Sequence, residues 1–572
     1  MQKVLRKYWA IFTLPTVICF AIAFLIPFIT GLGLSFSNFT TVTDAKFVGF
    51  ANYKKAFSGD SDFLPSLGRT VLFTIICMVL INLFGFILAL LLTRKMRGTS
   101  FFRTIFFMPN LIGGIVLGYV WQLILNGILM KYNQTLTTKG SYGIIGLIIL
   151  MCWQMTGYMM VIYIAALQNI NPDMIEAAEI DGASSWQTLI HIKIPTIMPA
   201  ITICTFLTLT NSFRLFDQNL ALTNGAPGND SALVALEYIQ NILRDYRLCW
   251  CRPGRSRNFH HYSGCYSCYP VACHTQEGSR VLMNKSRKTA NVIITIILAF
   301  LSLIFIGPIL MVLMNSFKGK LFISSEPFKF PTFKQQDLGE AGIMPKTFVG
   351  TKNYVSGVEK TNFWGAFGRS VFITVFSVLL IVVLTSMTAW FITRAKNHYA
   401  SVLYYLFVFS MVIPFQMVMY SMTKIADVLH LDNPVGILVL YLGFGAGMSV
   451  FMFSGFVKGI PTDIEEAAII DGCNPLQCFF KVVFPIMKPT SITVAILNTM
   501  WIWNDYLMPY LVMGKDYPTI PVAIQYLQGG YGSIDMGAMM AVLILAIIPI
   551  IIFYALCQRQ IIEGVVAGAV KG

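Results

Sequence analysis

Long apolar stretches follow one another along most of the chain, and short polar segments separate them. A helix needs about 20 mostly apolar residues to cross the hydrocarbon layer of a bilayer, and each stretch reaches or approaches that length. The stretches are centred on residues 16–34, 71–92, 105–125, 144–166, 194–210, 292–314, 371–391, 402–422, 435–456, 492–512 and 536–556. The pattern predicts an all-α polytopic membrane protein.

The composition excludes several other classes of protein. Of the 572 residues, 56% are hydrophobic and 12% are charged, whereas soluble domains carry about 25% charged residues. An ordinary soluble enzyme, a disordered scaffold and a nucleic-acid-binding protein are therefore excluded. The net charge of +15 comes mostly from Lys and Arg residues that flank the apolar stretches. We expect membrane lipid, and no nucleic acid, among the partners.

Clusters of Lys and Arg indicate the orientation, because such residues favour cytoplasmic loops. The clusters lie at residues 3–7, 94–103, 285–288 and 394–396. They predict a multi-pass protein of the cell membrane with a cytoplasmic amino terminus. The first apolar stretch is too long for a cleaved signal peptide and lacks a small-residue cleavage pattern, so we expect it to be a retained span.

The two sets of spans share a repeated segment at a constant offset of 290 residues. Each copy lies between the fourth and fifth stretches of its half and is predicted on the cytoplasmic side. Ala favours a helix, Gly suits a helix end, and Pro suits a first helical turn. The pattern therefore predicts a short helix, a turn, and a second helix leading back into the membrane. The shared positions are Glu176, Ala177, Ala178, Asp181, Gly182 and Pro195 in the first copy and Glu466, Ala467, Ala468, Asp471, Gly472 and Pro485 in the second.

A single copy of this segment would be explained by a helical hairpin that only connects two spans. Two copies with the same residues at the same spacing indicate a partner with two equivalent sockets. The repeat also predicts two parallel halves of about six transmembrane helices each.

The repeated segment resembles the signature loop of binding-protein-dependent ABC importer permeases: Glu-Ala-Ala, three residues, Gly, nine residues, then an apolar residue shortly before an apolar-Pro pair. Other stretches are similar to the maltose-type carbohydrate branch of that family. Phe216-Asp217 and the run 222–227 resemble its first membrane subunit, although Ala226 stands where the family usually has Gly. Trp503-Asn504-Asp505 and the tail 558–572 resemble its second subunit. The resemblance covers nearly the whole chain except residues 247–282.

This resemblance implies a transport permease and not an enzyme. An extracytoplasmic sugar-binding protein would deliver a maltose-type sugar or oligosaccharide, and two separate ABC ATPase subunits would bind the repeated loops and power alternating access. The chain itself contains no Gly-x4-Gly-Lys-[Ser/Thr] phosphate-binding motif, which fits that division of labour. We therefore expect no cofactor bound by this chain, with ATP and Mg²⁺ used by the partner subunits.

The sugar path is less evident from the sequence. Polar residues at membrane depth are candidates for functional roles. Hydrogen bonding between helices is the ordinary alternative for each of them. The candidates at the ends of the fifth stretches are Asn211, Ser212, Asn504 and Asp505, and Trp153 and Gln154 in the fourth stretch are further candidates.

Two other functions are alternatives for a protein with this pattern of spans. An ion- or proton-coupled sugar transporter also has two parallel halves, but it would require ionisable residues within the spans and no duplicated Glu-Ala-Ala loop. A membrane-embedded enzyme would require a cluster of His, Asp or Glu. Outside residues 247–282 the only His residues are His191, His398 and His430, which are far apart in sequence. We predict no catalytic residue and no metal ligand.

Residues 247–282 divide the chain into a first permease half, 1–246, and a second, 283–572. They hold five of the twelve Cys and three of the six His, at a place where the repeat requires a sixth span. Cys265 and Cys268 with the neighbouring His residues suggest zinc, but the spacing is irregular. If residues 247–282 were a simple linker, the second half would have the opposite orientation in the membrane. If they crossed the membrane instead, several Arg residues would be buried, at a cost of roughly 2.5–3.5 kcal/mol each.

Translation shifted by one nucleotide offers a better explanation of this junction. Back-translated codons from Phe259 to His274, read one nucleotide later, give mostly apolar residues, and Met283 resembles a fresh start. We therefore predict that 247–282 is a frameshifted sixth span, so that the sixth span of the first half is disrupted and two adjacent membrane subunits are fused.

Overall fold

The computed structural model describes residues 7–38, 45–58, 61–94, 96, 98–240, 285–333, 336–337, 343–344, 347–395, 397–527 and 535–569. The junction 247–282, with its predicted frameshift and its zinc candidates, lies outside these residues. The described part is built almost wholly of helices, so the predicted fold class is confirmed.

The first half begins with one long helical span, Trp9–Ser35, made of α2 (Trp9–Phe20), a π-helical turn η1 (Ala21–Leu25) and α3 (Ile26–Ser35). The remaining helices before the junction follow in chain order. They are α4 (Ala51–Ala56), α5 (Phe63–Leu92), α6 (Thr99–Phe107), η3 (Met108–Leu111), α7 (Gly114–Leu129), η4 (Met130–Tyr132), α8 (Gly140–Gln168), α9 (Pro172–Ile180), α10 (Ser185–Thr188), η5 (Leu189–Lys193), α11 (Ile194–Thr196), α12 (Met198–Phe213) and α13 (Asp217–Leu222).

The second half follows the same order and ends in a long helix. Its elements are α15 (Lys285–Asn315), α16 (Lys320–Ser325), α17 (Lys352–Lys360), α18 (Phe363–Ala395), α19 (His398–Val412), α20 (Phe415–Val428), α21 (Gly436–Val457), α22 (Thr462–Ile470), α23 (Pro475–Cys478), η7 (Phe479–Val483), α24 (Phe484–Ile486), α25 (Lys488–Asn504), α26 (Leu507–Met513), α27 (Ile520–Tyr526) and α28 (Met536–Ala569).

Among the described residues, eight helices are long and apolar enough to cross a membrane, and three bent helix pairs raise the number to eleven if each pair is one span. The sequence also predicted eleven. One predicted span is shifted: the stretch 105–125 is interrupted by the 3-10 turn η3, and the span runs over Gly114–Tyr132 instead. Pro109 within η3 cannot continue an α-helix, so the apolar run is longer than the helix that follows. The predicted stretch 492–512 likewise ends early, at Asn504, where α25 stops.

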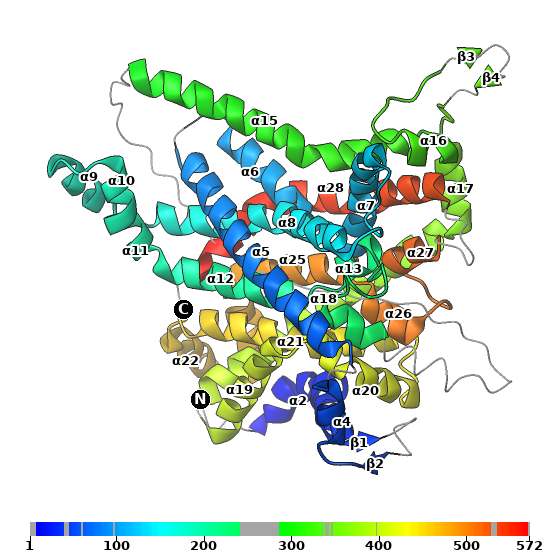
Figure 1. Ribbon diagram of the computed structural model, residues 1–572. Coiled ribbons are helices and arrows are strands. Elements are labelled where there is room, and N and C mark those ends of the chain that lie inside the picture. The colour runs from blue at the N-terminus through cyan, green and yellow to red at the C-terminus, as the bar shows by residue number, and fades with distance from the viewer. Residues whose placement is uncertain are drawn as a thin grey trace.

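The first helix of each half packs against the other half. Helix α2 contacts α18 and α21, while α15 contacts α6, α7 and α28 and crosses the top of the molecule in Figure 1. Hydroxyl groups join α2 to α18: Thr16 donates to the Leu384 carbonyl (3.1 Å) and Thr388 donates to the Phe12 carbonyl (2.9 Å). The two halves are therefore interleaved and form one packed unit.

Both halves point the same way. The repeated segments, α9–α10 and α22, lie at the left of Figure 1, and the two small hairpins lie at the opposite end. These antiparallel hairpins pair β1 (Ser37–Asn38) with β2 (Lys46–Phe47) and β3 (Gln336–Asp337) with β4 (Ile343–Met344). The parallel arrangement predicted from the repeat is therefore present in the fold.

The hairpin end contains a second repeat that the sequence analysis missed. Asn52 donates to the carbonyls of Ser35 (3.1 Å) and Ser37 (2.8 Å), and Asn353 donates in the same way to Ser316 (2.7 Å) and Lys318 (2.8 Å). In both halves a short helix, α4 or α17, is thereby attached to the end of the first span. The shared Asn-Tyr pair in each half was the available sequence signal.

Candidate coupling helices and translocation path

Each repeated segment starts with a nine-residue helix that ends in the same way. In the first copy the Gly182 amide donates to the Glu179 carbonyl (3.2 Å) and the Ala183 amide donates to the Ala178 carbonyl (2.9 Å). This is the Schellman pattern, which satisfies the last carbonyls of a helix and places a left-handed residue after its end. Gly182 has φ +78° and nothing lies within 4 Å of a Cβ built on it.

The second copy has the same hydrogen bonds at the end of its helix. The Gly472 amide donates to the Ile469 carbonyl (3.0 Å), the Cys473 amide donates to the Ala468 carbonyl (3.0 Å), and Gly472 has φ +87°. Only glycine adopts this backbone conformation without strain, which is why Gly occurs at the same place in both halves.

The following helix also has the same design in the two copies. A capping box closes its start, between Ser184 and Gln187 in the first copy and between Asn474 and Gln477 in the second. A π-helical turn and a short α-helix containing Pro195 or Pro485 come next. The chain then bends by 70° into α12 and by 78° into α25. Because Pro has no amide hydrogen, the regular ladder is interrupted just where the helix turns into the bundle.

The predicted coupling residues divide into exposed and buried sets, and the division is the same in both copies. Ala178 and Ala468 are buried, whereas the preceding alanine of each pair is exposed. Their backbone carbonyls accept the amides that cap each helix. Their side chains are buried under the turn that follows. The exposed set is Glu176, Ala177, Asp181, Gly182, Pro195, Glu466, Ala467, Asp471, Gly472 and Pro485.

One apolar side chain stands out near the end of α9 and of α22, the candidate coupling helices. Ile180 and Ile470 are each 85% exposed, one residue before the Asp that ends the helix. They occupy equivalent positions in the repeat, on the same side of the molecule. Their matched exposure makes the ends of α9 and α22 candidate contact surfaces. The sequence analysis did not single them out, although their equivalence was visible in the repeat.

The four residues predicted for the sugar path lie in different environments. Asn504 crosses between the halves, because its side-chain amide donates to the Leu111 carbonyl (2.9 Å). Asp505 is buried within the second half, where it accepts from the Tyr441 hydroxyl (2.9 Å) and the Leu507 amide (3.1 Å). Ser212 is fully buried and Asn211 is half-buried on α12. The four residues therefore differ in their burial and in their partners.

A small pocket lies where the two halves meet, and Asn504 is the only one of those four residues that lines it. Its other lining residues are mostly apolar and come from α7 and the two residues before it in the first half, and from α25, α27 and α28 in the second. They are Ile112, Gly113, Ile115, Val116, Trp503, Ile520, Pro521, Ile524, Ala546, Ile547 and Ile550.

Polar residues missed by the sequence analysis lie beside α7. A Cβ on Gly114 would lie 2.7 Å from the Asp217 Cβ, so α13 and α7 approach closely there. Gln218 donates to Gln154 (2.9 Å), which was one of the candidates in the fourth stretch. The Tyr119 hydroxyl on α7 donates to Gln525 of the second half. These groups provide a polar boundary between the halves near Asn504.

A repeated clamp holds the segment that follows the fifth span. Arg69 donates to the Ala232 carbonyl (3.1 Å) and Arg369 donates to the Pro518 carbonyl (2.9 Å). The next residue in each case, Thr70 or Ser370, accepts a backbone amide: Thr70 from Val234 (2.9 Å) and Ser370 from Ile520 (3.0 Å). The start of α5 and the start of α18 therefore fix the same part of each half. Both halves have Gly-Arg followed by Thr or Ser at this place, and this similarity could have been noticed in the sequence.

Two parts of the chain, residues 82–318 and 382–565, match the family described as the binding-protein-dependent transport system inner membrane component. Together they cover more than half of the 572 residues. The chain belongs to this family. The permease carries its family domain twice, which confirms the resemblance drawn from the repeated loop.

Known relatives of the permease are each about half its length. It is 42% identical over 245 residues to the probable starch degradation products transport system permease protein AmyD of Thermoanaerobacterium thermosulfurigenes, covering 41% of the permease and 83% of AmyD. It is 38% identical over 272 residues to AmyC of the same organism and system, covering 47% of the permease and 93% of AmyC. A solved bacterial ABC transporter that imports alginate aligns with 49% of the permease and 99% of that chain, at 21% identity and a TM-score of 0.39.

Proposed function

We propose that this permease is the membrane component of an ATP-driven importer and passes sugars of the starch-derived oligosaccharide or maltose type into the cytoplasm. The observation that carries the proposal is the pair of coupling segments: two helices with the same cap, the same bend and the same exposed residues, on one side of the molecule. Two equal protrusions on one face suit a partner with two equal sockets, such as a pair of ATPase subunits.

The coupling helices have the features of a docking surface. Ile180 and Ile470 would enter apolar sockets, and the exposed carboxylates Glu176 and Glu466 lie one helical turn before them. A central apolar side chain within a polar rim is the usual form of an energetic hot spot. In this proposal, ATP-driven closure of the ATPase pair moves both helices and favours the outward-facing permease. ATP and Mg²⁺ belong to those subunits, and the coupling side is cytoplasmic, together with the amino terminus.

The substrate class and the binding protein are supported by the relatives. AmyC and AmyD are named as permeases for starch degradation products, and another relative, MsmG of Streptococcus mutans, is named as a permease of a multiple sugar-binding transport system. An extracytoplasmic sugar-binding protein would deliver the sugar at the hairpin end. The path would open at the boundary between the halves, beside Asn504 and its contact with Leu111.

The test is assembly followed by uptake. The permease is expressed together with candidate ATPase subunits, and the amount of ATPase that co-purifies is compared for Ile180→Glu, Ile470→Glu and a control, Phe330→Glu. Phe330 is an apolar, 82% exposed residue that follows α16, and α16 lies on the opposite side of Figure 1 from α9 and α22. Placing a charge in each socket should weaken binding about tenfold or more, because a lost hot spot costs about 2 kcal/mol. The control should bind as the wild type does.

Uptake of labelled maltooligosaccharides by reconstituted vesicles then tests the substrate. Transport should require ATP and the binding protein, and unlabelled maltose-type sugars should compete. Equal ATPase binding by all variants would overturn the docking proposal. Uptake that survives ATP depletion while an ion gradient remains would instead support a secondary transporter.

The predicted fusion has its own test. Resequencing the source DNA across codons 240–290 should show one nucleotide more or fewer than the single reading frame requires. The product would then be two six-span chains, and the importer would contain their heterodimer. An unchanged frame would overturn the frameshift prediction.

A further inference from the structure

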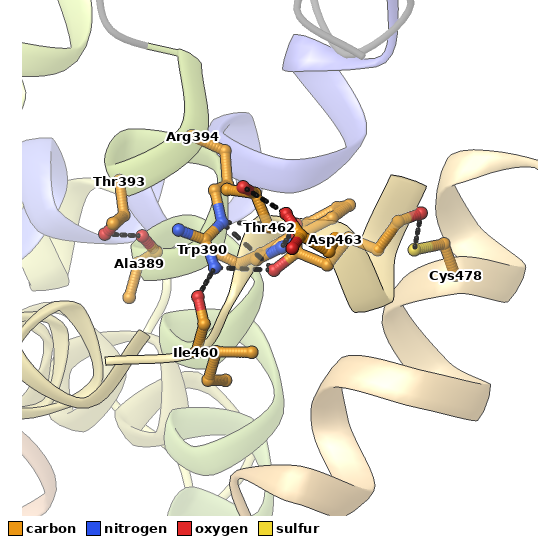
Figure 2. Close-up of polar contacts among 9 residues, drawn as sticks. Ala389, Trp390, Thr393, Arg394, Ile460, Thr462, Asp463 and Cys478 are labelled. Carbon is orange, nitrogen blue, oxygen red and sulfur yellow. Dashed lines mark hydrogen bonds and ion pairs between the residues drawn. The ribbon is translucent and has the colours of Figure 1, made fainter. Parts of the chain in front are cut away.

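A buried ion pair lies at the start of the second coupling helix. Glu465 is in the first turn of α22 with a side chain that is 0% exposed, and Arg394 is at the end of α18 with a side chain that is 9% exposed. The Arg394 Nε donates to both carboxylate oxygens (3.0 and 3.1 Å), and its Nη2 donates to Oε1 (2.7 Å). Nη2 also donates to the Ile460 carbonyl (2.8 Å), just before α22 begins. Figure 2 shows Arg394 reaching from α18 to this segment, between Trp390 and Thr462.

The carboxylate has a second donor on the same helix. The Trp390 indole Nε1 donates to Glu465 Oε2 (3.1 Å), one helical turn before Arg394. The Trp390 ring contacts Phe12 of α2 (5.2 Å between ring centroids) and Phe479 of the π-turn η7 (5.5 Å). One polar and aromatic cluster therefore joins the coupling helix, the helix that leads back into the membrane, α18, and the first helix of the other half.

Among the described residues of the first half, the positions equivalent to this ion pair do not form one. The position equivalent to Glu465 is Ile175, which is half-buried on α9. The Thr-Arg pair at the end of α18 has its counterpart in Thr93-Arg94 at the end of α5, where Arg94 is exposed. The two helices have the same shape, but within the part of the chain that the structure describes only α22 is attached to its membrane helix by a buried, bidentate ion pair.

We infer that Arg394 and Glu465 are positioning residues that make α22 and α18 move as one rigid body. Ionic hydrogen bonds of this kind fix direction as well as distance, because the planar guanidinium holds two oxygens at once. Movement of the second coupling helix would pass directly to α18 and, through Trp390 and Phe12, to α2 of the first half. The first coupling helix would move more independently of α5. This inference rests on the proposed docking of ATPase subunits only in its last step, the transmission of movement.

The joint itself is tested on the permease alone, by amide hydrogen exchange. Arg394→Met should speed exchange in α22 by about tenfold or more, because the helix loses its attachment and opens locally. The bundle helices α21 and α25 should keep their protection. Arg94→Met is the matched control and should leave α9 unchanged. Equal exchange in α22 of the variant and the wild type would overturn the inference, and so would a loss of protection throughout the second half.

Two milder variants test the same ion pair in case Arg394→Met does not fold. Arg394→Lys keeps the charge but loses the planar fork, and Trp390→Phe keeps the ring contacts but removes one donor. Each should speed α22 exchange by about threefold, less than Arg394→Met, if the geometry of the ion pair is what holds the helix. Full protection in both variants would contradict the assigned role.

The transmission step is tested on the assembled importer. Arg394→Met should retain ATPase co-purification to within about twofold, since the docking surface is untouched, while sugar uptake per ATP hydrolysed falls about tenfold. Unchanged coupling would overturn this step. If the wild-type permease bound no ATPase, the proposed function would fail, but the exchange result for α22 would stand.

Discussion

The first and second coupling segments have nearly the same backbone but different attachments. Their C-terminal helix caps, their glycines at positive φ and their bends of 70° and 78° agree. The difference that bears on attachment is in the first turn, where Ile175 of α9 stands in the place of Glu465 of α22. Local backbone chemistry therefore sets the shape of a coupling segment. A single buried position decides whether it is held by apolar contact or by an ion pair.

Breaking the ion pair should have the largest effect on stability. Arg394→Met leaves Glu465 buried without its countercharge, and the free energy of local opening of α22 should fall by about 3–5 kcal/mol. Arg94→Met in the first half should change the free energy of opening of α9 by less than about 0.5 kcal/mol, because Arg94 is exposed. Amide hydrogen exchange in detergent micelles measures both. Equal losses would remove the claimed difference between the halves.

The repeated clamps should show near-equal effects in the two halves. Thr70→Val and Ser370→Ala each remove the acceptor of a backbone amide, from Val234 and Ile520. An unsatisfied buried donor costs about 1–3 kcal/mol. Thr202→Val is the control, because its hydroxyl only bonds its own helix at the surface. A loss in one half alone would show that the clamps are not equivalent.

The capping glycines sharpen the comparison further. Gly182→Ala and Gly472→Ala should each cost about 1–2 kcal/mol, because an L-residue is strained at positive φ, while nothing lies close enough to clash with the new methyl group. The same small shift in melting temperature is expected for both. A much larger loss at Gly472 would mean that the ion pair makes the second turn less adaptable.

A further effect concerns pH at the hairpin end. Lys318 is buried in the second half, with its Nζ donating to the Glu326 carbonyl (2.9 Å), and Ser37 takes its place in the first. Burial lowers the pKa of Lys318 to about 8. The cost of burying the charge is complete below that pH and disappears as the pH rises toward the ordinary pKa of Lys, about 10.4.

Stability should therefore rise with pH between about 8 and 10. Lys318→Met should lose that part of the rise, as measured by melting temperature across the same range. An identical pH profile in the variant would show that Lys318 keeps its ordinary pKa.

Much of this could be predicted from local sequence. The apolar stretches identified the spans, and the repeat identified both coupling segments, because helix caps and turns depend on residues a few positions apart. The same reasoning did not find the break at Pro109, where an apolar run hides a change of helix. It also could not tell which alanine of each pair faces inward, because Ala178 and Ala468 are buried by packing and not by their type.

The sequence by itself determined the fold class, the two parallel halves and the shape of the coupling segments, since hydrophobic length, helix propensity and capping act over short distances. Only the tertiary structure decided what lies between the halves and what holds each coupling helix. Asn504 meets Leu111, Tyr119 meets Gln525, and Arg394 meets Glu465 across 71 residues of chain. Such contacts depend on how distant helices pack. A buried charge is tolerated only where that packing places its partner within hydrogen-bonding distance.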